Sequence, residues 1–255
     1  MRIFKKLSRA LGSRLCRFGE EIPSITMRYP DMEPKDVEQC WAVNPYSMTS
    51  MERRFALLEA VRYIVKNNIR GAIVECGVWK GGSMMLVAQS LLELGVTDRH
   101  LYLFDTFEGM PPPSSSDVSR TGSSALDVLT SELNIKQDSY VWALAGLEEV
   151  QSNLASSSYP KERVNFVKGK VEDTLPGHAP SEIALLRLDT DWYASTKHEL
   201  EHLYSRLAPN GIMIIDDYGF WKGARQAVDE FLATLPHRPY LHRVDHDARL
   251  IIKPN

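Results

Sequence analysis

The sequence is poor in cysteine and lacks the close cysteine pairs that zinc and redox motifs require. Its three cysteines, Cys16, Cys40 and Cys76, are odd in number and widely spaced. We therefore predict neither a disulfide framework nor a zinc site. No apolar run approaches the roughly 18 residues that a membrane-spanning helix needs, and a net charge of −3 gives no general case for nucleic-acid binding. A reducing cytoplasm is the expected compartment.

The remaining composition is that of an ordinary folded domain. A chain of 255 residues is long enough for one large α/β domain with small additions. The sequence shows no internal repeat and no break in composition that would divide it into two large domains. We expect an N-terminal basic helix and irregular cap segment at residues 1–48, followed by one domain at residues 49–255.

Basic residues and regularly spaced apolar residues mark the first 19 positions. Apolar side chains recur every three or four residues there, and the first acid is Glu20. On a helix this spacing makes one apolar stripe. The segment is interpreted either as a helix that packs on the domain or on a partner subunit, or as a membrane-surface or targeting helix.

From residue 71 the chain alternates strand and helix patterns, which predicts a parallel sheet with right-handed crossovers. Two short strands close together at the end predict an antiparallel hairpin. The expected fold class is therefore α/β. Strands are expected at 72–76, 101–105, 164–167, 183–189 and 212–216, the hairpin at 240–244 and 249–253, helices at 52–68, 81–94, 125–134, 142–156, 195–207 and 222–234, and irregular chain at 22–49 and 106–124.

Acidic residues follow two of these predicted strands. Asp189 ends one apolar run, and Asp216 and Asp217 end the next. Because ligands gather at the carboxyl ends of strands in an open α/β sheet, neighbouring strands would bring these carboxylates together, with Asp191 close by. Such a cluster needs a cation or shared protons, and all-oxygen ligation favours Mg²⁺, Mn²⁺ or Ca²⁺. Each aspartate alone could instead cap a turn.

A glycine-rich turn follows the first predicted strand, between Glu75 and Ser83. Glycines let the backbone approach a ligand closely, and the helix that follows points free N–H groups at an anionic group. The G-x-G-x-x-G fingerprint of nicotinamide binding is missing. Asp105, at the end of the second strand, is placed to accept hydrogen bonds from ribose hydroxyls. Together they predict a pocket for an adenosine-bearing cofactor, with a ligand-free turn and a capping aspartate as the alternatives.

Several motifs follow one another in order over residues 45–235. The main ones are Val74-Glu75-Cys76-Gly77-Val78-Trp79-Lys80-Gly81-Gly82-Ser83, Tyr102-Leu103-Phe104-Asp105-Thr106-Phe107-Glu108-Gly109-Met110-Pro111, Leu186-Arg187-Leu188-Asp189-Thr190-Asp191-Trp192-Tyr193 and Ile215-Asp216-Asp217-Tyr218-Gly219. Shorter ones are Tyr46-Ser47-Met48-Thr49-Ser50, Phe166-Val167-Lys168-Gly169 and Asp173-Thr174-Leu175-Pro176. Together these motifs resemble the macrocin O-methyltransferase (TylF-type) family.

The resemblance implies a class I S-adenosylmethionine (SAM)-dependent methyltransferase fold. This fold is a Rossmann-like seven-stranded sheet with helices on both faces and a C-terminal antiparallel hairpin. The resemblance also implies a divalent metal, usually Mg²⁺, and methylation of a hydroxyl group on a small, glycosylated natural product by a homo-oligomer. It implies metal ligands at Asp189, Asp216 and Asp217, and cofactor-binding residues at Thr49, Glu75, Gly77, Val78, Trp79, Ser83, Asp105, Thr106, Phe107 and Asp173.

A neutral hydroxyl group is a poor nucleophile, so the reaction needs a proton acceptor as well as the metal. Asp189 is the first candidate and Asp191 the second. Asp191 shares the face of Asp189 only if the strand continues past residue 189. His246 is a third candidate, with simple solvation as its alternative. A nicotinamide oxidoreductase and a non-catalytic SAM-binding homologue are the competing functions.

The C-terminal tail departs from the family pattern. The family ending is usually rich in aromatic residues, whereas here the chain reads Val244-Asp245-His246-Asp247-Ala248-Arg249. The resemblance therefore does not assign the acceptor. Residues 111–124, Trp221 and the N-terminal segment are where we expect acceptor specificity to lie.

Overall fold

The computed structural model describes residues 29–136, 139 and 141–255. The chain divides into two compact units, the first ending at Ala42 and the second spanning Val43–Asn255. The expected N-terminal basic helix lies outside the described residues, and the domain boundary expected at residue 48 stays a prediction. The expectation of irregular chain at residues 22–49 is wrong in part, because helix α3 (Pro34–Ala42) forms there. Its proline occupies the first helical position, where a missing N–H costs nothing.

The second unit is built on one seven-stranded sheet with the strand order β3-β2-β1-β4-β5-β7-β6. Strands β1 to β5 pair in parallel, and β7 and β6 pair antiparallel at one edge. The predicted parallel sheet and C-terminal hairpin are therefore confirmed. The strands are β1 (Ala72–Cys76), β2 (Leu101–Asp105), β3 (Val164–Lys168), β4 (Ile183–Leu188), β5 (Leu207–Ile215), β6 (His242–Arg243) and β7 (Arg249–Ile252).

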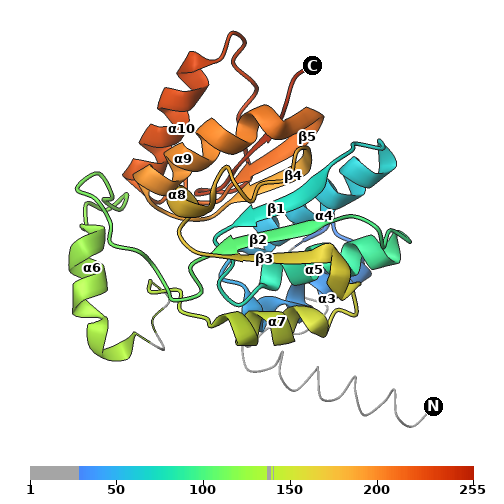
Figure 1. Cartoon of the computed structure of the whole chain (residues 1–255), viewed down its shortest axis with the longest axis horizontal. Helices are drawn as coiled ribbons and strands as arrows, with labels where there is room; N and C mark the ends of the chain where they lie inside the picture. Colours follow the sequence, from blue (N-terminus) through green and yellow to red (C-terminus); the bar gives the residue numbers. More distant parts are fainter. Residues whose placement is uncertain (1–28, 137–138, 140) are drawn as a thin grey trace. The chain divides into compact units, whose positions relative to one another are not determined.

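Helices cover both faces of the sheet (Figure 1). On one face lie α4 (Met51–Lys66), α5 (Gly82–Glu93) and α7 (Leu147–Ala155), and on the other α8 (Val171–Thr174), α9 (Tyr193–Leu203) and α10 (Lys222–Thr234). Helix α6 (Ala125–Ser131) lies beside the sheet rather than over one of its faces (Figure 1), and Ala125 and Leu129 of α6 pack with Ala224 of α10. Short 3-10 turns add η2 (Asn44–Tyr46), η3 (Leu133–Ile135), η4 (Lys161–Arg163) and η5 (Tyr204–Arg206).

Local chemistry explains where two of these helices begin. Ser50 caps α4 as predicted, because its hydroxyl oxygen accepts a hydrogen bond from the backbone N–H of Arg53. Helix α7 begins five residues later than the predicted residue 142. Ala143 has a φ of 43°, a left-handed conformation that a right-handed helix cannot include.

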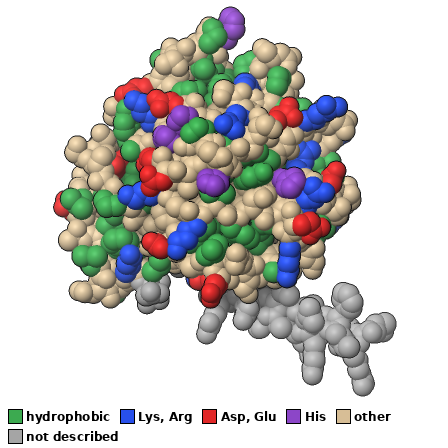
Figure 2. All heavy atoms as spheres, in the orientation of Figure 1, with side chains coloured by type: hydrophobic (Ala, Val, Ile, Leu, Met, Phe, Trp, Pro, Cys, Tyr) green, Lys and Arg blue, Asp and Glu red, His purple; other side chains and the backbone are tan. Residues whose placement is uncertain are grey.

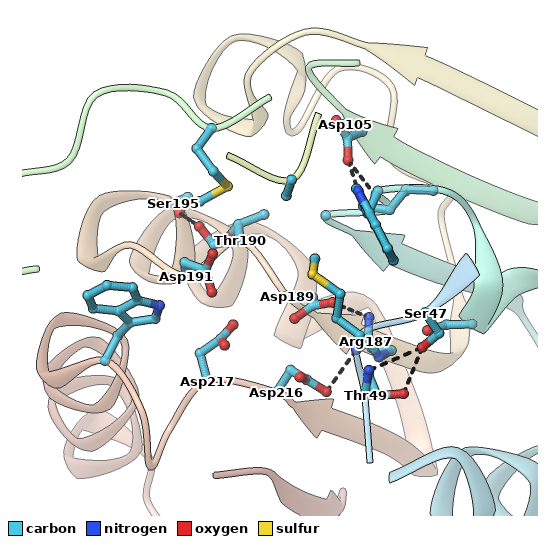
Figure 3. Close-up of a pocket in the computed structure, with 18 of the residues that line it drawn as sticks. Ser47, Thr49, Asp105, Arg187, Asp189, Thr190, Asp191, Ser195, Asp216 and Asp217 are labelled. Carbon is cyan, nitrogen blue, oxygen red and sulfur yellow. Dashed lines mark hydrogen bonds and ion pairs between the residues drawn. The ribbon is translucent and has the colours of Figure 1, made fainter. Parts of the chain in front are cut away.

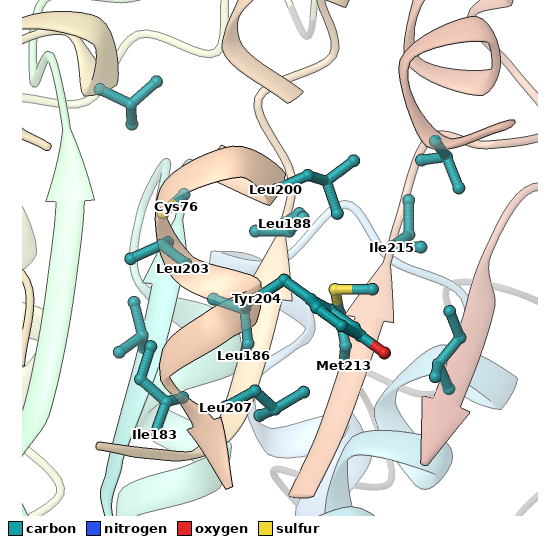
Figure 4. Close-up of a cluster of buried hydrophobic side chains, with 14 of the residues drawn as sticks. Cys76, Ile183, Leu186, Leu188, Leu200, Leu203, Tyr204, Leu207, Met213 and Ile215 are labelled. Atoms are coloured by element: carbon teal, nitrogen blue, oxygen red, sulfur yellow. The ribbon is translucent and has the colours of Figure 1, made fainter. Parts of the chain in front are cut away.

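A buried apolar cluster joins the sheet to α9 (Figure 4). Leu186 and Leu188 of β4 pack there with Leu200 and Leu203 of α9, and all four side chains are at most 2% exposed. Side chains alternate along a strand, so Arg187 points to the opposite face of the sheet. This alternation places a charged residue in the middle of an apolar strand.

On the face of the molecule shown in Figure 2, basic and acidic side chains are interspersed. In the part of the chain that the structure describes, no helix has the length and apolar character needed to cross a membrane.

Candidate active site

A pocket of about 520 Å³ opens at the carboxyl ends of the parallel strands. Its walls come from the segments that follow β1 to β5, from residues 46–53 and from the turn between β6 and β7. The volume is typical of small-molecule sites, and this edge of an α/β sheet is where ligands bind. The pocket therefore lies where the sequence predicts the site.

The turn after β1 approaches the turn after β4 so closely that it requires glycine. Gly77 has a φ of 82°, and a Cβ atom there would lie 2.0 Å from the backbone oxygen of Asp189. The backbone N–H of Asp189 in turn donates to the carbonyl oxygen of Cys76 at 2.8 Å. One end of the pocket is therefore fixed by backbone contact between β1 and β4.

Asp105 fastens two loops of the pocket together. Its Oδ2 accepts hydrogen bonds from the N–H groups of Val78 at 2.6 Å and Trp79 at 3.2 Å. Its Oδ1 accepts from the N–H of Phe107 at 2.7 Å and from Thr106 Oγ1 at 3.4 Å. Burial raises the pKa of Asp105, and these donors act against that rise. The carboxylate therefore holds the turn after β1 against the loop after β2.

Three aspartates converge on the side of the pocket formed by the segments after β4 and β5 (Figure 3). Asp189 follows β4, while Asp216 and Asp217 follow the neighbouring strand β5. One carboxylate oxygen from each lies within 4.8 Å of the other two. The convergence predicted from the strand ends is therefore present, and it is an all-oxygen donor set.

A buried arginine from β4 compensates part of this acid cluster. The Arg187 side chain is 4% exposed, and its Nη1 donates to Glu75 Oε1 at 2.7 Å and to Asp189 Oδ2 at 2.6 Å. Its Nη2 donates to Asp216 Oδ1 at 2.7 Å. Burial acts to lower the pKa of Arg187, but Asp189, Asp216 and Glu75 raise it well above its ordinary value. The guanidinium group therefore stays charged between three carboxylates.

A second arginine reaches the cluster from α4. Arg53 Nη1 donates to Asp216 Oδ2, Nε donates to Asp245 Oδ2 at 2.8 Å, and Nη2 donates to Asp247 Oδ2 at 3.0 Å. Sequence reasoning assigned no role to Arg53, Arg187, or the carboxylates of the β6–β7 turn. For Arg187 a signal existed, because a charged residue inside an apolar strand needs a buried partner.

Asp191 faces Asp217 rather than extending strand β4 (Figure 3). The strand ends at Leu188, and Asp191 has a φ of 65°. The carboxyl group of Asp191 lies opposite that of Asp217 (Figure 3), and the Asp217 carboxyl group and the Trp221 indole act to lower the pKa of Asp191. Burial, together with repulsion by Asp189 and Asp216, raises the pKa of Asp191 to about 7.

The structure brings most of the predicted site residues to this pocket. Glu75 lies beneath it, paired with Arg187, and Phe107 reaches it only through its N–H bond to Asp105. Asp173 is exposed on α8 and does not line the pocket, whereas its neighbour Glu172 does. The predicted residues that line the pocket are Thr49, Gly77, Val78, Trp79, Ser83, Asp105, Thr106, Asp189, Asp191, Asp216 and Asp217.

The same fold occurs in solved methyltransferases. The O-methyltransferase NovP superposes with a TM-score of 0.70 at 30% sequence identity, over 82% of this chain and 83% of NovP. The calicheamicin methyltransferase CalS11 superposes with a TM-score of 0.62 at 17% identity, over 87% of this chain and 93% of CalS11. The fold is that of the class I SAM-dependent methyltransferases, as the sequence predicts.

Sequence comparison narrows this class to one family. The model of the macrocin O-methyltransferase (TylF) family matches residues 13–251, and the chain belongs to that family. A Streptomyces olivaceus relative, 8-demethyl-8-(2,3-dimethoxy-alpha-L-rhamnosyl)-tetracenomycin-C 4'-O-methyltransferase, is 34% identical over 202 residues, which are 79% of this chain and 73% of the relative. Mycinamicin III 3''-O-methyltransferase of Micromonospora griseorubida is 31% identical over 187 residues, 73% of this chain and 70% of the relative. The protein is a SAM-dependent O-methyltransferase, so the nicotinamide alternative is dropped.

Proposed function

We propose that this enzyme methylates a hydroxyl group on a sugar of a natural product and that it uses a divalent cation, with Mg²⁺ as the first candidate. The observation that carries the proposal is the convergence of Asp189, Asp216 and Asp217 at one end of the pocket. The acceptor class is supported by the tetracenomycin relative, whose name describes a compound that carries a rhamnosyl group. We further propose a cytoplasmic homo-oligomer.

The donor set fits a hard divalent ion. Around an octahedral ion with oxygen ligands at about 2.1 Å, adjacent ligand oxygens lie about 3.0 Å apart and opposite ones about 4.2 Å. Carboxylate oxygens that lie within 4.8 Å of one another would therefore move closer together to share the ion. The acids Asp189, Asp216 and Asp217 would hold the ion, and Arg187 and Arg53 would orient Asp216 from behind. Such an ion supplies Lewis-acid chemistry, which polarises a hydroxyl group and makes its proton easier to remove.

The methyl donor is proposed to occupy the end of the pocket at β1 and β2. The turn from Gly77 to Ser83 would hold its methionine end, and Asp105 would accept hydrogen bonds from its ribose. A carboxylate offers about four lone-pair sites. Three of them accept backbone N–H groups here, and the Thr106 hydroxyl, which donates to the Gly109 carbonyl oxygen at 2.7 Å, lies 3.4 Å from Oδ1. Ribose hydroxyls would replace the two longest of these bonds, those from Trp79 and Thr106. The placement of Asp173 near the adenine of the cofactor stays a prediction.

Asp105→Asn is expected to weaken binding of S-adenosylhomocysteine about 100-fold. The amide keeps one acceptor oxygen and turns an NH₂ group toward the N–H donors of the loops, so at least one charge-assisted hydrogen bond becomes a repulsive contact. Isothermal titration calorimetry measures the change. Asp127→Asn is the matched control, because Asp127 is exposed on α6 and does not line the pocket. Equal affinity of Asp105→Asn and wild type would remove Asp105 from the donor site.

The reaction needs a base beside the acceptor hydroxyl, and we propose Asp191 in preference to Asp189. Burial raises the pKa of Asp189 well above its ordinary value, and the hydrogen bond from Arg187 acts against that rise. Asp189 is also a proposed metal ligand, and a carboxylate that binds an ion is a poor proton acceptor. Among the described residues Asp191 pairs with no arginine, and burial raises its pKa to about 7. A carboxyl group near neutrality combines a useful ionised fraction with proton affinity.

Asp191→Asn is expected to lower kcat by about 10² to 10⁴-fold, the usual contribution of a general base. Asparagine tolerates the left-handed φ of residue 191, so the turn should be retained. Binding of S-adenosylhomocysteine should be unchanged. Single-turnover assays separate methyl transfer from product release. If Asp191→Asn has the kcat of wild type, Asp191 is not the general base and Asp189 becomes the candidate.

Methyl transfer itself is tested with labelled SAM and a panel of glycosides, including phenyl α-L-rhamnopyranoside and phenyl β-D-glucopyranoside. We expect labelled methyl ether on at least one glycoside in Mg²⁺ and none in a chelator. Transfer at an equal rate in the chelator would reject the metal, and transfer to none of the glycosides would reject the sugar acceptor.

A further inference from the structure

We propose that His246 contacts the acceptor sugar and determines which acceptor is methylated, and that residues 245–247 form a rigid turn that holds it in place. This inference rests on the proposed function. The inference is supported by the contacts of this turn, because both of its carboxylates bind other segments of the chain while His246 lines the pocket.

The turn is first fixed by its own backbone. Asp245 Oδ1 accepts hydrogen bonds from the N–H of Asp247 at 2.8 Å and from the N–H of Ala248 at 2.7 Å. A side chain that bonds the backbone two and three residues ahead closes a tight local ring. This ring sets the direction in which residue 246 leaves the chain.

Two other segments then anchor the turn. Asp245 Oδ2 accepts from Ser50 Oγ at 2.9 Å and from Arg53 Nε at 2.8 Å. Asp247 accepts from Arg53 through Oδ2 at 3.0 Å and from Arg120 through Oδ1 at 2.6 Å. Burial acts to raise the pKa of Asp245, but its donors outweigh burial and lower it to about 2. The start of α4 and the loop before α6 therefore hold the turn.

The backbone of the segment after β5 packs directly against the same turn. The N–H of Gly219 donates to the carbonyl oxygen of Asp247 at 2.8 Å. A Cβ atom at Gly219 would lie 2.0 Å from the carbonyl oxygen of His246. No side chain fits there, so glycine allows the two backbones to touch.

The same anchors place the turn beside the reacting end of the pocket. Arg53 contacts Asp216 as well as Asp245 and Asp247. The turn and the acid cluster are therefore separated by the width of one guanidinium group. A group presented by this turn faces the part of an acceptor that is close to the methylated hydroxyl.

His246 is the side chain that the turn presents. It lines the pocket, is 61% exposed, and has its Nε2 3.4 Å from Asp247 Oδ2. Phe220 and Trp221 line the pocket as well, and their rings meet edge to face at 5.0 Å. A neutral imidazole offers one hydrogen-bond donor and one acceptor, and aromatic rings offer flat apolar faces. This combination suits a neutral sugar that carries a hydroxyl group next to the methylated one.

The test compares His246→Ala and His246→Gln with wild type on phenyl α-L-rhamnopyranoside and its monodeoxy analogues. We expect His246→Ala to raise the acceptor KM about 10-fold and to lose the wild-type discrimination against one deoxy analogue. The affinity for S-adenosylhomocysteine and the melting temperature should not change. His246→Gln, which keeps a donor and an acceptor, should recover most of the loss.

His242→Ala is the matched control, because His242 is exposed on β6 of the same hairpin and does not line the pocket. An acceptor KM within twofold of wild type in His246→Ala, with discrimination intact, would overturn the inference. An equal rise of the acceptor KM in His242→Ala would overturn the inference too, because it would assign the change to the fold of the hairpin. A weaker affinity of His246→Ala for S-adenosylhomocysteine would overturn it for the same reason. If the wild-type chain binds S-adenosylhomocysteine but methylates no glycoside, the proposed function fails and the inference fails with it.

Discussion

Asp217→Asn is expected to lower methyl transfer by at least about 10³-fold, which corresponds to the several kcal/mol that a catalytic metal contributes. Asp217 is a sharper target than Asp216, whose carboxylate also holds the Arg53 and Arg187 side chains. The partner of the Asp217 carboxyl group is Asp191, so asparagine removes a proposed metal ligand without releasing a buried arginine. The fold and the donor site should be retained.

Three measurements identify the cause of this loss. Electron paramagnetic resonance with Mn²⁺ should show weaker binding, while calorimetry with S-adenosylhomocysteine and the melting temperature should match wild type. Asp127→Asn, an exposed acid on α6, is the control for removing one negative charge. Wild-type Mn²⁺ affinity together with wild-type turnover in Asp217→Asn would show that this residue is not a metal ligand.

Arg187→Met is expected to lower the free energy of unfolding by about 3–5 kcal/mol, the cost of breaking a buried ion pair from one side. Methionine fills much of the same space but leaves Glu75, Asp189 and Asp216 without their shared cation. Urea denaturation followed by circular dichroism measures the loss. Arg62→Met is the control, because the Arg62–Glu59 pair is partly exposed and such pairs contribute at most about 1 kcal/mol.

The dependence of the free energy of unfolding on pH and on Mg²⁺ shows whether Arg187→Met destabilises the protein through lost charge compensation or through lost packing. Burial raises the pKa of Glu75 and of Asp189, and Arg187 acts against that rise. Without the arginine both pKa values therefore move further above those of the unfolded state, and folding takes up more protons. The loss in free energy of unfolding relative to wild type should therefore be smallest near pH 5 and should grow as the pH rises toward 8. Added Mg²⁺ should recover part of it, because the ion supplies positive charge to the same acids. A deficit independent of both pH and Mg²⁺ would contradict the role of Arg187 as the compensating cation.

Much of the scaffold was determined by local sequence. Short apolar runs between turn residues predict the strands, and β1 and β2 have the predicted limits. Acids directly after neighbouring strands predict that Asp189, Asp216 and Asp217 meet, since parallel strands present their carboxyl ends at one edge. The glycine turn is local as well, because Gly77 must adopt a positive φ at the point where β1 meets β4. These features depend on residues close in sequence and on the general geometry of a sheet.

Only the tertiary structure decided how the charges are compensated. Arg187 pairs with Glu75 across 112 positions of the chain, and Arg53 pairs with Asp245 across 192. No periodicity encodes such partners, because electrostatic pairing depends on distance in space and on burial. The turn that sets Asp191 opposite Asp217 also follows from where β4 ends rather than from the spacing of the two aspartates. The local sequence thus supplies the acids, and the packing of distant segments decides which are held by arginine and which face the pocket.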